Sequence, residues 1–355
     1  MTKKPFNKVR MKKVAKKIVG HVIRYALVIS LSYMILYPLL RMLTLVISHP
    51  RALGAVGGIW IPPMFSLDNF RVAFGVMDFW STLLFTVRNV STIMILQVLC
   101  AAFAGYAFAR LRFKGMGFLF IMVLITFIVP AEVFMLPQRV LFQNFDIFGI
   151  LGAVEGTGAA QALGFSIGGF RPFGWLVDGP VNMLGSPAAM FVLAGTGMGL
   201  AGGLFIYIFR QFFRGLPKEL EEAAYVDGAG FLRTFFTIVF PMAKPAFLTV
   251  GTLSFIWNYN DTHFPTLFNP TNRYMSIRAQ LLEQVQGGTS IMQNMISQAR
   301  SAGRIAHEVE SLGTPLYDAA LRQVSAFVAI LPLIILFLII QKQFVEGVER
   351  SGIVG

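Results

Sequence analysis

The sequence predicts an all-α membrane protein with six transmembrane helices, and three observations lead to that prediction. The chain of 355 residues is 55% hydrophobic and 13% charged, and its mean hydropathy of +0.67 is too high for a soluble globular domain. Six apolar stretches are each long enough to cross about 30 Å of hydrocarbon, which takes about 20 helical residues. The basic residues are also distributed unequally between the segments that connect these stretches.

The six spans are expected near 25–47, 89–109, 115–137, 186–209, 234–257 and 323–341. They divide the chain into a basic segment 1–24, a single transmembrane domain 25–345 and a tail 346–355. The connections after the third and fifth spans, 138–185 and 258–322, are long enough to be docking surfaces. Solvated connections with local helix are an equally good interpretation of both.

The distribution of charge predicts the topology. Nine Lys and Arg residues and no acid precede the first span, so the positive-inside rule places the N-terminus in the cytoplasm. Six spans then put both termini there, with nineteen of the thirty Lys and Arg residues in inner segments and nine in outer ones. The first apolar stretch is long and lacks a small-residue cleavage site, which argues against a cleaved signal peptide. The basic residues form no groove-lining patch, so we expect no nucleic acid partner.

We expect no catalytic residue and no metal site in this chain. The sequence contains no G-x-x-x-x-G-K-[ST], so any ATP hydrolysis must come from another subunit. The four histidines have no metal-ligand spacing, and the single cysteine, Cys100, has no partner for an internal disulfide. Residues 164–168 match G-x-S-x-G, but a nucleophile elbow needs a strand before it and a helix after it. Here the match lies in a Gly-rich loop, and we attribute it to chance.

The segment from Leu216 to Pro241 lies between the fourth and fifth spans, on the predicted cytoplasmic side. Pro217 suits the first position of a helix, and the positive end of the helix dipole favours the three glutamates that follow. Gly228 and Gly230 are expected to end this helix after about eleven residues, or about 16 Å. The side open to a partner would carry Leu220, Ala223, Ala224 and Asp227.

The same segment resembles the EAA motif of the permease subunits of ATP-binding-cassette importers. In that motif E-A-A is followed after three residues by G and, nine residues later, by I-x-L-P. Six residues match at these spacings: Glu222, Ala223, Ala224, Gly228, Ile238 and Pro241. Phe240 replaces the usual Leu, which exchanges one apolar residue for another. E-A-A alone is not specific, whereas six positions in register between two spans are.

Further segments are similar to the carbohydrate importers of this family, in particular to the second permease of maltose-type systems. These segments are Ser66–Phe70, Gly105–Gly115, Pro130 with Pro137, Arg210–Phe213, Tyr259–Asp261 and the C-terminal FVEGVERSGIVG. The chain departs from that pattern in a Gly-rich insertion around 151–185 and an extended loop around 285–316. It also has Tyr259 where the family usually has Trp. The role of both loops and the identity of the solute stay open.

The resemblance implies a type I importer permease fold and a division of labour among subunits. The chain would lie in the bacterial cytoplasmic membrane beside a second permease, expected to be a different chain, and membrane lipid. Two ATPase subunits would bind ATP and Mg²⁺, and an extracytoplasmic binding protein would deliver solute, so this chain needs no cofactor and is not an enzyme. The EAA helix would dock into a groove of an ATPase, where Glu222 meets polar or basic groups and Ala223 and Ala224 allow close approach. Ile238 and Pro241 would fix how this helix joins the fifth span.

Four residues are candidates for lining the solute pathway: Glu132, Asn258, Tyr259 and Asn260. Sugar hydroxyls need hydrogen-bond partners and aromatic faces, whereas helix capping and gate packing are the competing interpretation. A permease for a non-sugar solute is an alternative within transport. A membrane scaffold or sensor is an alternative from another class, but the sequence shows no cytoplasmic domain for it. An intramembrane enzyme would need a partner for Glu132, and the spans offer none.

Overall fold

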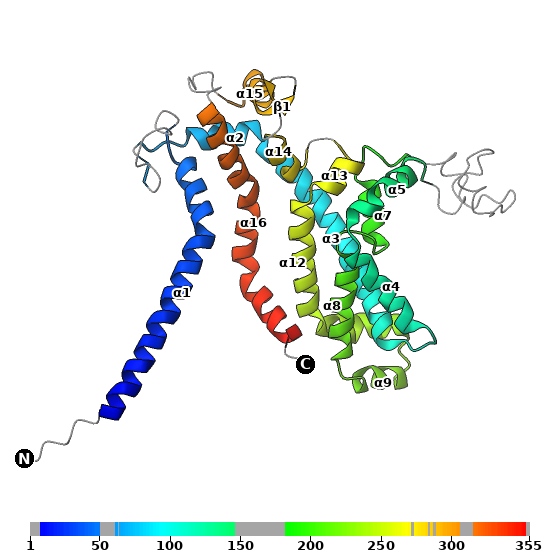
Figure 1. Cartoon of the computed structure of the whole chain (residues 1–355). Coiled ribbons are helices and arrows are strands. Elements are labelled where there is room, and N and C mark those ends of the chain that lie inside the picture. The colour runs from blue at the N-terminus through cyan, green and yellow to red at the C-terminus, as the bar shows by residue number, and fades with distance from the viewer. Residues whose placement is uncertain are drawn as a thin grey trace, which may run out of the picture. The chain divides into compact units, whose positions relative to one another are not determined.

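The computed structural model describes residues 8–49, 61–62, 64–145, 182–270, 273–282, 285–286, 289–305 and 315–352 (Figure 1). Most of the Gly-rich insertion and the whole G-x-S-x-G match lie outside these ranges. The chain divides into two compact units, and the division falls within the last helix. Unit 1 comprises Met1–Val76 and Glu283–Ile330, and unit 2 comprises Met77–Leu282 and Leu331–Gly355.

Unit 1 contains α1 (Lys8–Val46), α2 (Asp68–Val76), the short hairpin β1 (Val285–Gln286) and β2 (Thr289–Ser290), α15 (Ile291–Ser301) and the first part of α16 (Pro315–Gly352). Asn69 of α2 holds the end of α1, because its Nδ2 donates to the carbonyl oxygens of Leu45 and Ser48 at 2.9 and 2.8 Å. α15 packs on α2, and its side chains Ile296 and Ala299 are buried. Part of the extended loop is therefore an ordered helix within this unit.

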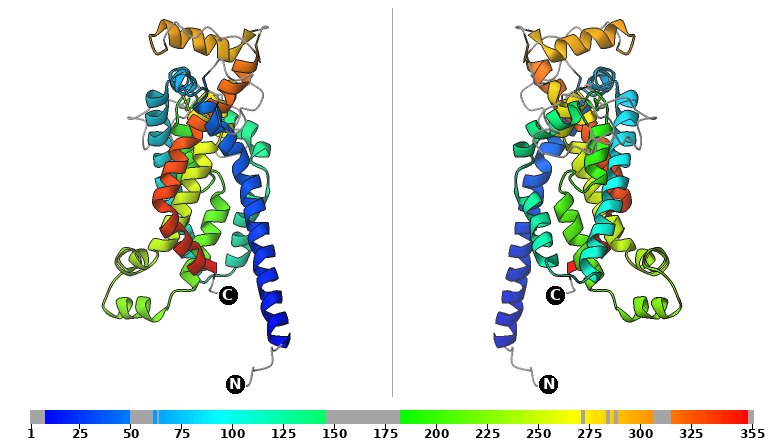
Figure 2. Two further views of the ribbon diagram at one scale, coloured as in Figure 1. Left: turned by 90° about the vertical axis from the view of Figure 1, so that its left-hand side faces the viewer. Right: turned by 90° about the vertical axis from the view of Figure 1, so that its right-hand side faces the viewer.

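Unit 2 contains α3 (Phe79–Arg110), α4 (Met116–Ile128), α5 (Ala131–Gln143), α7 (Ala188–Gly195), α8 (Gly202–Arg214), α9 (Glu219–Val226), α10 (Phe231–Thr234), the π-helical turn η2 (Phe235–Val239), α11 (Phe240–Met242), α12 (Lys244–Asn260), α13 (His263–Phe268) and α14 (Met275–Leu281). α3 lies at its centre and packs on α8, α12 and α7 (Figure 1). The short helices α9 and α10–α11 project together from one end of the unit (Figure 2).

Glycines bring the helices of unit 2 close together. A Cβ atom on Gly105 of α3 would lie 2.6 Å from Phe209 Cβ and 2.9 Å from the backbone nitrogen of Arg210. A Cβ atom on Gly203 of α8 would lie 2.5 Å from the carbonyl oxygen of Val123 in α4. Small residues allow such close approach between membrane helices, which lack a hydrophobic driving force for association in lipid. α8 therefore packs closely on both α3 and α4.

Within the described part of the chain, three helices are long and apolar enough to cross a membrane, namely Lys16–Val46 of α1, α3, and Tyr317–Lys342 of α16. Two further pairs of helices are long and apolar enough only when the two members of each pair are taken together, and the members meet at an angle. Met116–Ile128 and Glu132–Gln143 meet at 98°, and Phe231–Met242 and α12 meet at 80°. If each bent pair counts as one span, these five correspond to the first, second, third, fifth and sixth predicted spans.

The fourth predicted span, 186–209, differs from a continuous helix. α7 ends at Gly195 and α8 begins at Gly202, and between them Gly197 and Ala201 adopt left-handed φ angles of 78° and 56°. Glycine enters this conformation at little cost, so the glycines of this segment allow the helix to be interrupted. Hydropathy detects the apolar length of such a segment but not its break.

The bend before α12 has a local cause in the sequence. Pro241 and Pro245 stand on either side of the buried Ala243, where the two helices meet. Proline has no N–H to donate and its ring clashes with the preceding turn, so a helix kinks or ends there. The helical segment before the bend, Phe231–Met242, is called the leg here. It also contains η2, whose wider turn shows that the backbone is not a regular α-helix.

Substitution of Gly105 tests the packing of α3 on α8. In Gly105→Ala the new Cβ meets a side chain and backbone within 3.0 Å, and overpacking of this kind costs about 1–3 kcal/mol. We expect the purified chain to unfold at a lower temperature than the wild type in detergent. Gly117→Ala is the control, because a Cβ there has no neighbour within 4 Å. Equal unfolding temperatures for the two variants would contradict the close approach.

Candidate functional site

The first helix of the Leu216–Pro241 segment is α9. It begins at Glu219, two residues after Pro217, and has eight residues rather than the expected eleven. Gly228 ends it as predicted, with a left-handed φ of 80°. The N–H of Gly228 donates to the carbonyl oxygen of Tyr225 at 3.1 Å, and the N–H of Ala229 donates to that of Ala224 at 2.9 Å. These two bonds form a Schellman motif, which satisfies carbonyls that the helix end leaves free.

Glu221 attaches α9 to the end of α3. Its carboxylate accepts hydrogen bonds from Arg110 Nε at 2.7 Å and from the Tyr106 hydroxyl at 2.9 Å, and it lies 2.6 Å from Arg110 Nη2. Arg110 Nη2 also donates to the carbonyl oxygen of Leu216 at 3.0 Å. The Glu221 residue is only 5% exposed, so this is a buried ion pair with several hydrogen bonds.

Aromatic packing surrounds the buried pair. The Tyr106 ring centroid lies 4.9 Å from that of Phe231 and 5.1 Å from that of Phe235, which belong to the leg after α9. It lies 5.5 Å from that of Phe213 in α8, which is fully buried. Tyr106 therefore contacts the helix before α9 and the helices after it, while its hydroxyl holds α9 itself. Removal of water from this cluster strengthens the charged hydrogen bonds inside it.

The opposite side of α9 is exposed and carries part of the matched motif. Glu222 and Ala223 are exposed, as are the apolar side chains of Leu220 and Val226, the latter to 88%. Ala224 differs from the expectation, because it is buried against its own chain and is not part of the open surface. Of the two alanines of the motif, Ala223 is therefore the one that lies on the exposed surface, where its small side chain leaves room for a partner.

Ile238 and Pro241 lie in the short leg between α9 and the bend. Ile238 is half-buried within η2, and Pro241 is exposed in α11. They precede the bend at Ala243 rather than lying in a straight fifth span. The leg contacts both α9 and α12, and so connects the two.

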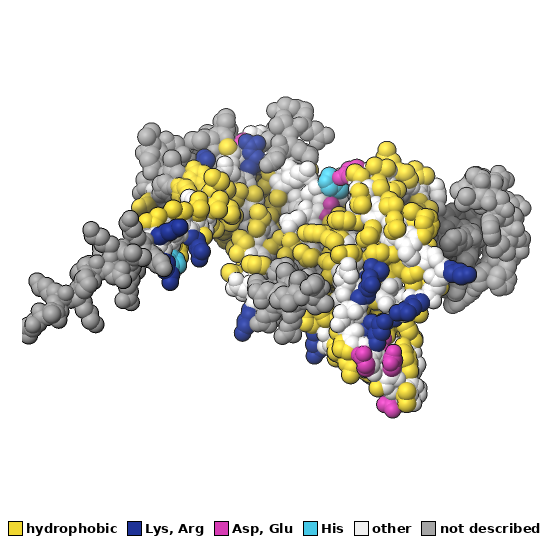
Figure 3. All heavy atoms as spheres, turned by 60° about the horizontal axis from the view of Figure 1, so that its bottom comes forward, with side chains coloured by type: hydrophobic (Ala, Val, Ile, Leu, Met, Phe, Trp, Pro, Cys, Tyr) yellow, Lys and Arg dark blue, Asp and Glu magenta, His cyan; other side chains and the backbone are white. Residues whose placement is uncertain are grey.

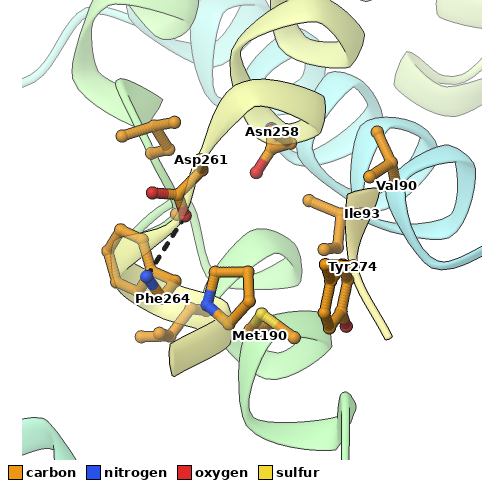
Figure 4. Close-up of a pocket in the computed structure, with 11 residues that line it drawn as sticks. Val90, Ile93, Met190, Asn258, Asp261, Phe264 and Tyr274 are labelled. Carbon is orange, nitrogen blue, oxygen red and sulfur yellow. Dashed lines mark hydrogen bonds between the residues drawn. The ribbon is translucent and has the colours of Figure 1, made fainter. Parts of the chain in front are cut away.

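A small pocket lies at the other end of unit 2, between α3, α7, α12 and α13 (Figure 4). Apolar side chains form most of its wall, and Asn258 lies across it from Met190. Asn258 Nδ2 donates to Gln97 Oε1 at 3.1 Å, and the same oxygen accepts from Ser254 Oγ at 2.7 Å. Gln97 Nε2 donates to the carbonyl oxygen of Leu200 at 2.6 Å, so the network holds the break between α7 and α8.

Two further polar groups line the pocket. Asp261 accepts hydrogen bonds from the backbone N–H groups of His263 at 3.0 Å and Phe264 at 3.2 Å. Burial raises the pKa of the Asp261 carboxyl above its ordinary value, although these backbone bonds oppose the shift. Burial likewise raises the pKa of the Tyr274 hydroxyl to about 12. The pocket therefore offers few charges and a small number of hydrogen-bonding groups.

The four pathway candidates do not come together. Of these, only Asn258 lines the pocket. Glu132 is exposed in the first turn of α5, and Asn260 is exposed and donates to the carbonyl oxygen of Ile256 in its own helix. Tyr259 is 2% exposed and its ring stacks on Phe255. The described part of the chain also contains no group of three His, Cys, Asp or Glu residues that could hold a metal ion.

Sequence reasoning missed the residues that organise both regions. Glu221 stands beside the motif residue Glu222, and helical periodicity alone does not determine which glutamate faces inward. Arg110 ends a long apolar helix, where a basic residue is expected at a membrane boundary and does not indicate a buried partner. Gln97 had a clearer signal, because an uncharged polar residue in the middle of a span normally finds a partner within the protein.

Replacement of Glu221 tests the attachment of α9. Glu221→Gln keeps the shape of the side chain but removes its charge, and a hydrogen bond to a charged group contributes about 1.5–3 kcal/mol. We expect the backbone amides of α9 to exchange with deuterium about ten- to a hundredfold faster. Glu219→Gln removes an exposed charge from the same helix and is expected to leave exchange unchanged. Equal exchange in both variants would show that Glu221 does not hold α9.

Comparisons with known proteins agree with a transport subunit. The alpha-glucoside transport system permease protein AglG of Rhizobium meliloti (strain 1021) is 29% identical over 56% of this chain, and the match spans 44% of that relative. The arabinooligosaccharides transport system permease protein AraQ of Halalkalibacterium halodurans (strain ATCC BAA-125 / DSM 18197 / FERM 7344 / JCM 9153 / C-125) is 25% identical over 84% of this chain and 82% of its own length.

A solved structure shares the fold. It is a chain from the crystal structure of a bacterial ABC transporter involved in the import of the acidic polysaccharide alginate. The TM-score is 0.61 at 18% identity, and the match covers 96% of this chain and 100% of that chain. Residues 27–350 match the family model described as binding-protein-dependent transport system inner membrane component. This chain therefore belongs to the family of binding-protein-dependent transport system inner membrane components, which are multi-pass membrane proteins.

Proposed function

We propose that this chain is a membrane subunit of an ATP-driven importer that moves a sugar or oligosaccharide. It would work with a second permease, two ATPase subunits that bind ATP and Mg²⁺, and an extracytoplasmic binding protein. The observation that carries the proposal is α9, a helix with an exposed motif surface that a buried ion pair attaches to the longest helix of unit 2. The relatives named for alpha-glucoside and arabinooligosaccharide transport support a sugar as the solute.

The attachment of α9 suggests how motion reaches the membrane. An ATPase that binds the exposed side of α9 moves the helix when two ATPases close around ATP. Because Glu221 bonds to Arg110 and Tyr106, displacement of α9 pulls directly on α3. The leg from Phe231 to Met242 gives a second connection, to α12. α3 and α12 both line the pocket, so movement of α9 would change the shape of the pocket. The six-span topology with both termini cytoplasmic and α9 on that side is part of this proposal.

A bulky residue at position 223 tests docking of the ATPase. Ala223→Trp adds a large side chain to the exposed side of α9 without entering the core. We expect at least tenfold less ATPase to copurify with the tagged chain, because the shallow surface is filled. Ala302→Trp is the control, since Ala302 is also exposed but lies after α15 in unit 1. If the ATPase stays bound and uptake stays coupled to hydrolysis in Ala223→Trp, the docking assignment is wrong.

Two asparagines separate the solute pathway from helix capping. Asn258→Ala removes an amide from the pocket, and loss of one hydrogen bond of about 1 kcal/mol corresponds to about a fivefold change in affinity. We expect the concentration for half-maximal uptake of the oligosaccharide to rise about fivefold. Asn260→Ala, which removes an exposed side chain bonded to its own helix, is expected to change nothing. Equal uptake by both variants would remove Asn258 from the pathway.

The identity of the solute is tested on the extracytoplasmic binding protein. Binding of alpha-glucosides, arabinooligosaccharides and non-sugar solutes to the cognate binding protein would be measured by calorimetry. We expect micromolar or tighter binding of a sugar, because delivery to the permease requires a loaded binding protein. Binding of a non-sugar solute alone would replace the sugar by another solute and leave the importer assignment in place.

A further inference from the structure

Four basic side chains gather at the end of unit 2 where α3 and α8 finish and α4 begins. Arg112 and Lys114 lie in the turn between α3 and α4, and Arg210 and Arg214 lie in the last turns of α8. We call these four residues the basic cluster. Figure 3 shows Lys and Arg side chains gathered beside acidic side chains on this end of the molecule. Arg112, Lys114 and Arg214 are exposed, and Arg210 is half-buried.

Arg210 joins the three helices at this point. Its guanidinium carbon lies 3.8 Å from the ring centroid of Phe120 in α4, and its Nε donates to the carbonyl oxygen of Phe108 in α3 at 3.4 Å. The rings of Phe108 and Phe120 are themselves in contact, with centroids 5.5 Å apart. Stacking on an aromatic face fixes the plane of the guanidinium and leaves its outer N–H groups free to bind.

Among the described residues, no acidic side chain forms an ion pair with the basic cluster. In the part of the chain that the structure describes, none of the four has a carboxylate oxygen within 4.0 Å. Arg110, two residues before Arg112 in the chain, differs because it forms an ion pair with Glu221. Arg210 and Arg214 are four residues apart on one helix, a spacing at which like charges repel. A bound anion would remove this repulsion.

Apolar side chains adjoin the basic cluster and indicate what kind of anion fits. Leu111 and Phe113 in the same turn are 48% and 52% exposed, and Phe118 and Leu119 in the first turn of α4 are 63% and 45% exposed. The cluster therefore stands at the boundary between helix ends and apolar helix surface, as expected at the edge of a bilayer. A soluble acidic partner would leave these apolar groups in water, whereas a lipid covers them with its acyl chains.

We propose that the basic cluster binds the phosphodiester headgroup of an anionic phospholipid, in the leaflet next to α9. Arginine forks bind phosphate oxygens in pairs, and basic pockets between transmembrane helices on the cytoplasmic side hold anionic headgroups. The lipid would brace α3, α4 and α8 beside the Arg110–Glu221 pair. The site does not depend on which solute is carried and so goes beyond the proposed transport function.

The experiment measures lipid retention by the assembled importer. The complex is placed in nanodiscs of phosphatidylcholine with increasing phosphatidylglycerol, and bound phosphatidylglycerol is counted by native mass spectrometry. In Lys114→Gln/Arg214→Gln, which changes two exposed residues, we expect about twenty-five-fold weaker retention, or about fivefold for each charge removed. The control Arg233→Gln/Lys244→Gln removes two exposed charges elsewhere in unit 2 and is expected to change retention less than twofold.

A further variant separates charge from shape. Arg210→Lys keeps the charge but loses the planar fork, so we expect a loss of retention of a few fold, with retention in all forms falling as salt rises. Equal retention by the Lys114→Gln/Arg214→Gln variant and its control would overturn the proposal. Loss of the ATPase from that variant in discs without phosphatidylglycerol would also overturn it, because the basic cluster would then be a protein contact.

Discussion

The buried ion pair between Arg110 and Glu221 is the interaction on which the rest of the site depends. Two charges taken out of water carry a large desolvation cost, which is recovered only when geometry is good and further hydrogen bonds complete the set. Here the Tyr106 hydroxyl and the Leu216 carbonyl supply such bonds, and of the Arg110 nitrogens only Nη1 is buried without a partner. Such a pair adds little net stability compared with an apolar core, but breaking it by removal of one partner is expensive, about 3–5 kcal/mol. It therefore fixes where α9 sits.

Polar groups elsewhere in unit 2 have a similar task. Gln97 lies in the middle of α3, is 1% exposed, and donates to Leu200 in the break between α7 and α8. The break leaves backbone groups without helical partners, and in an apolar environment each such group needs a bond from a side chain or a neighbouring element. Two groups on α3 thus hold neighbouring segments in place. Arg110, at the end of α3, holds α9, and Gln97, near the middle of α3, holds the break between α7 and α8.

Much of the fold could be predicted from the sequence, because the hydropathy and charge of a segment depend directly on whether it lies in the membrane. Five of the six expected spans correspond to apolar helices or bent pairs, and the left-handed Gly228 ends α9 where the motif placed it. The bends and the broken fourth span were not predictable from hydropathy, since Pro241 with Pro245 and the glycines around 197 act on the backbone and not on transfer energy. The buried Glu221 was missed because its partner is more than a hundred residues away in the chain.

If the Arg110–Glu221 pair holds the two helices together, α9 and α3 move as one body. This coupling is tested most directly by the distance between spin labels at Glu219→Cys on α9 and Leu99→Cys on α3, in a Cys100→Ser background of the assembled importer. Pulsed electron resonance would be recorded without nucleotide and with bound ATP. We expect one narrow distance distribution with the same maximum in both states, and a broader one when Glu221→Gln is added. A shift of the maximum on ATP binding while Glu221 is intact would contradict it.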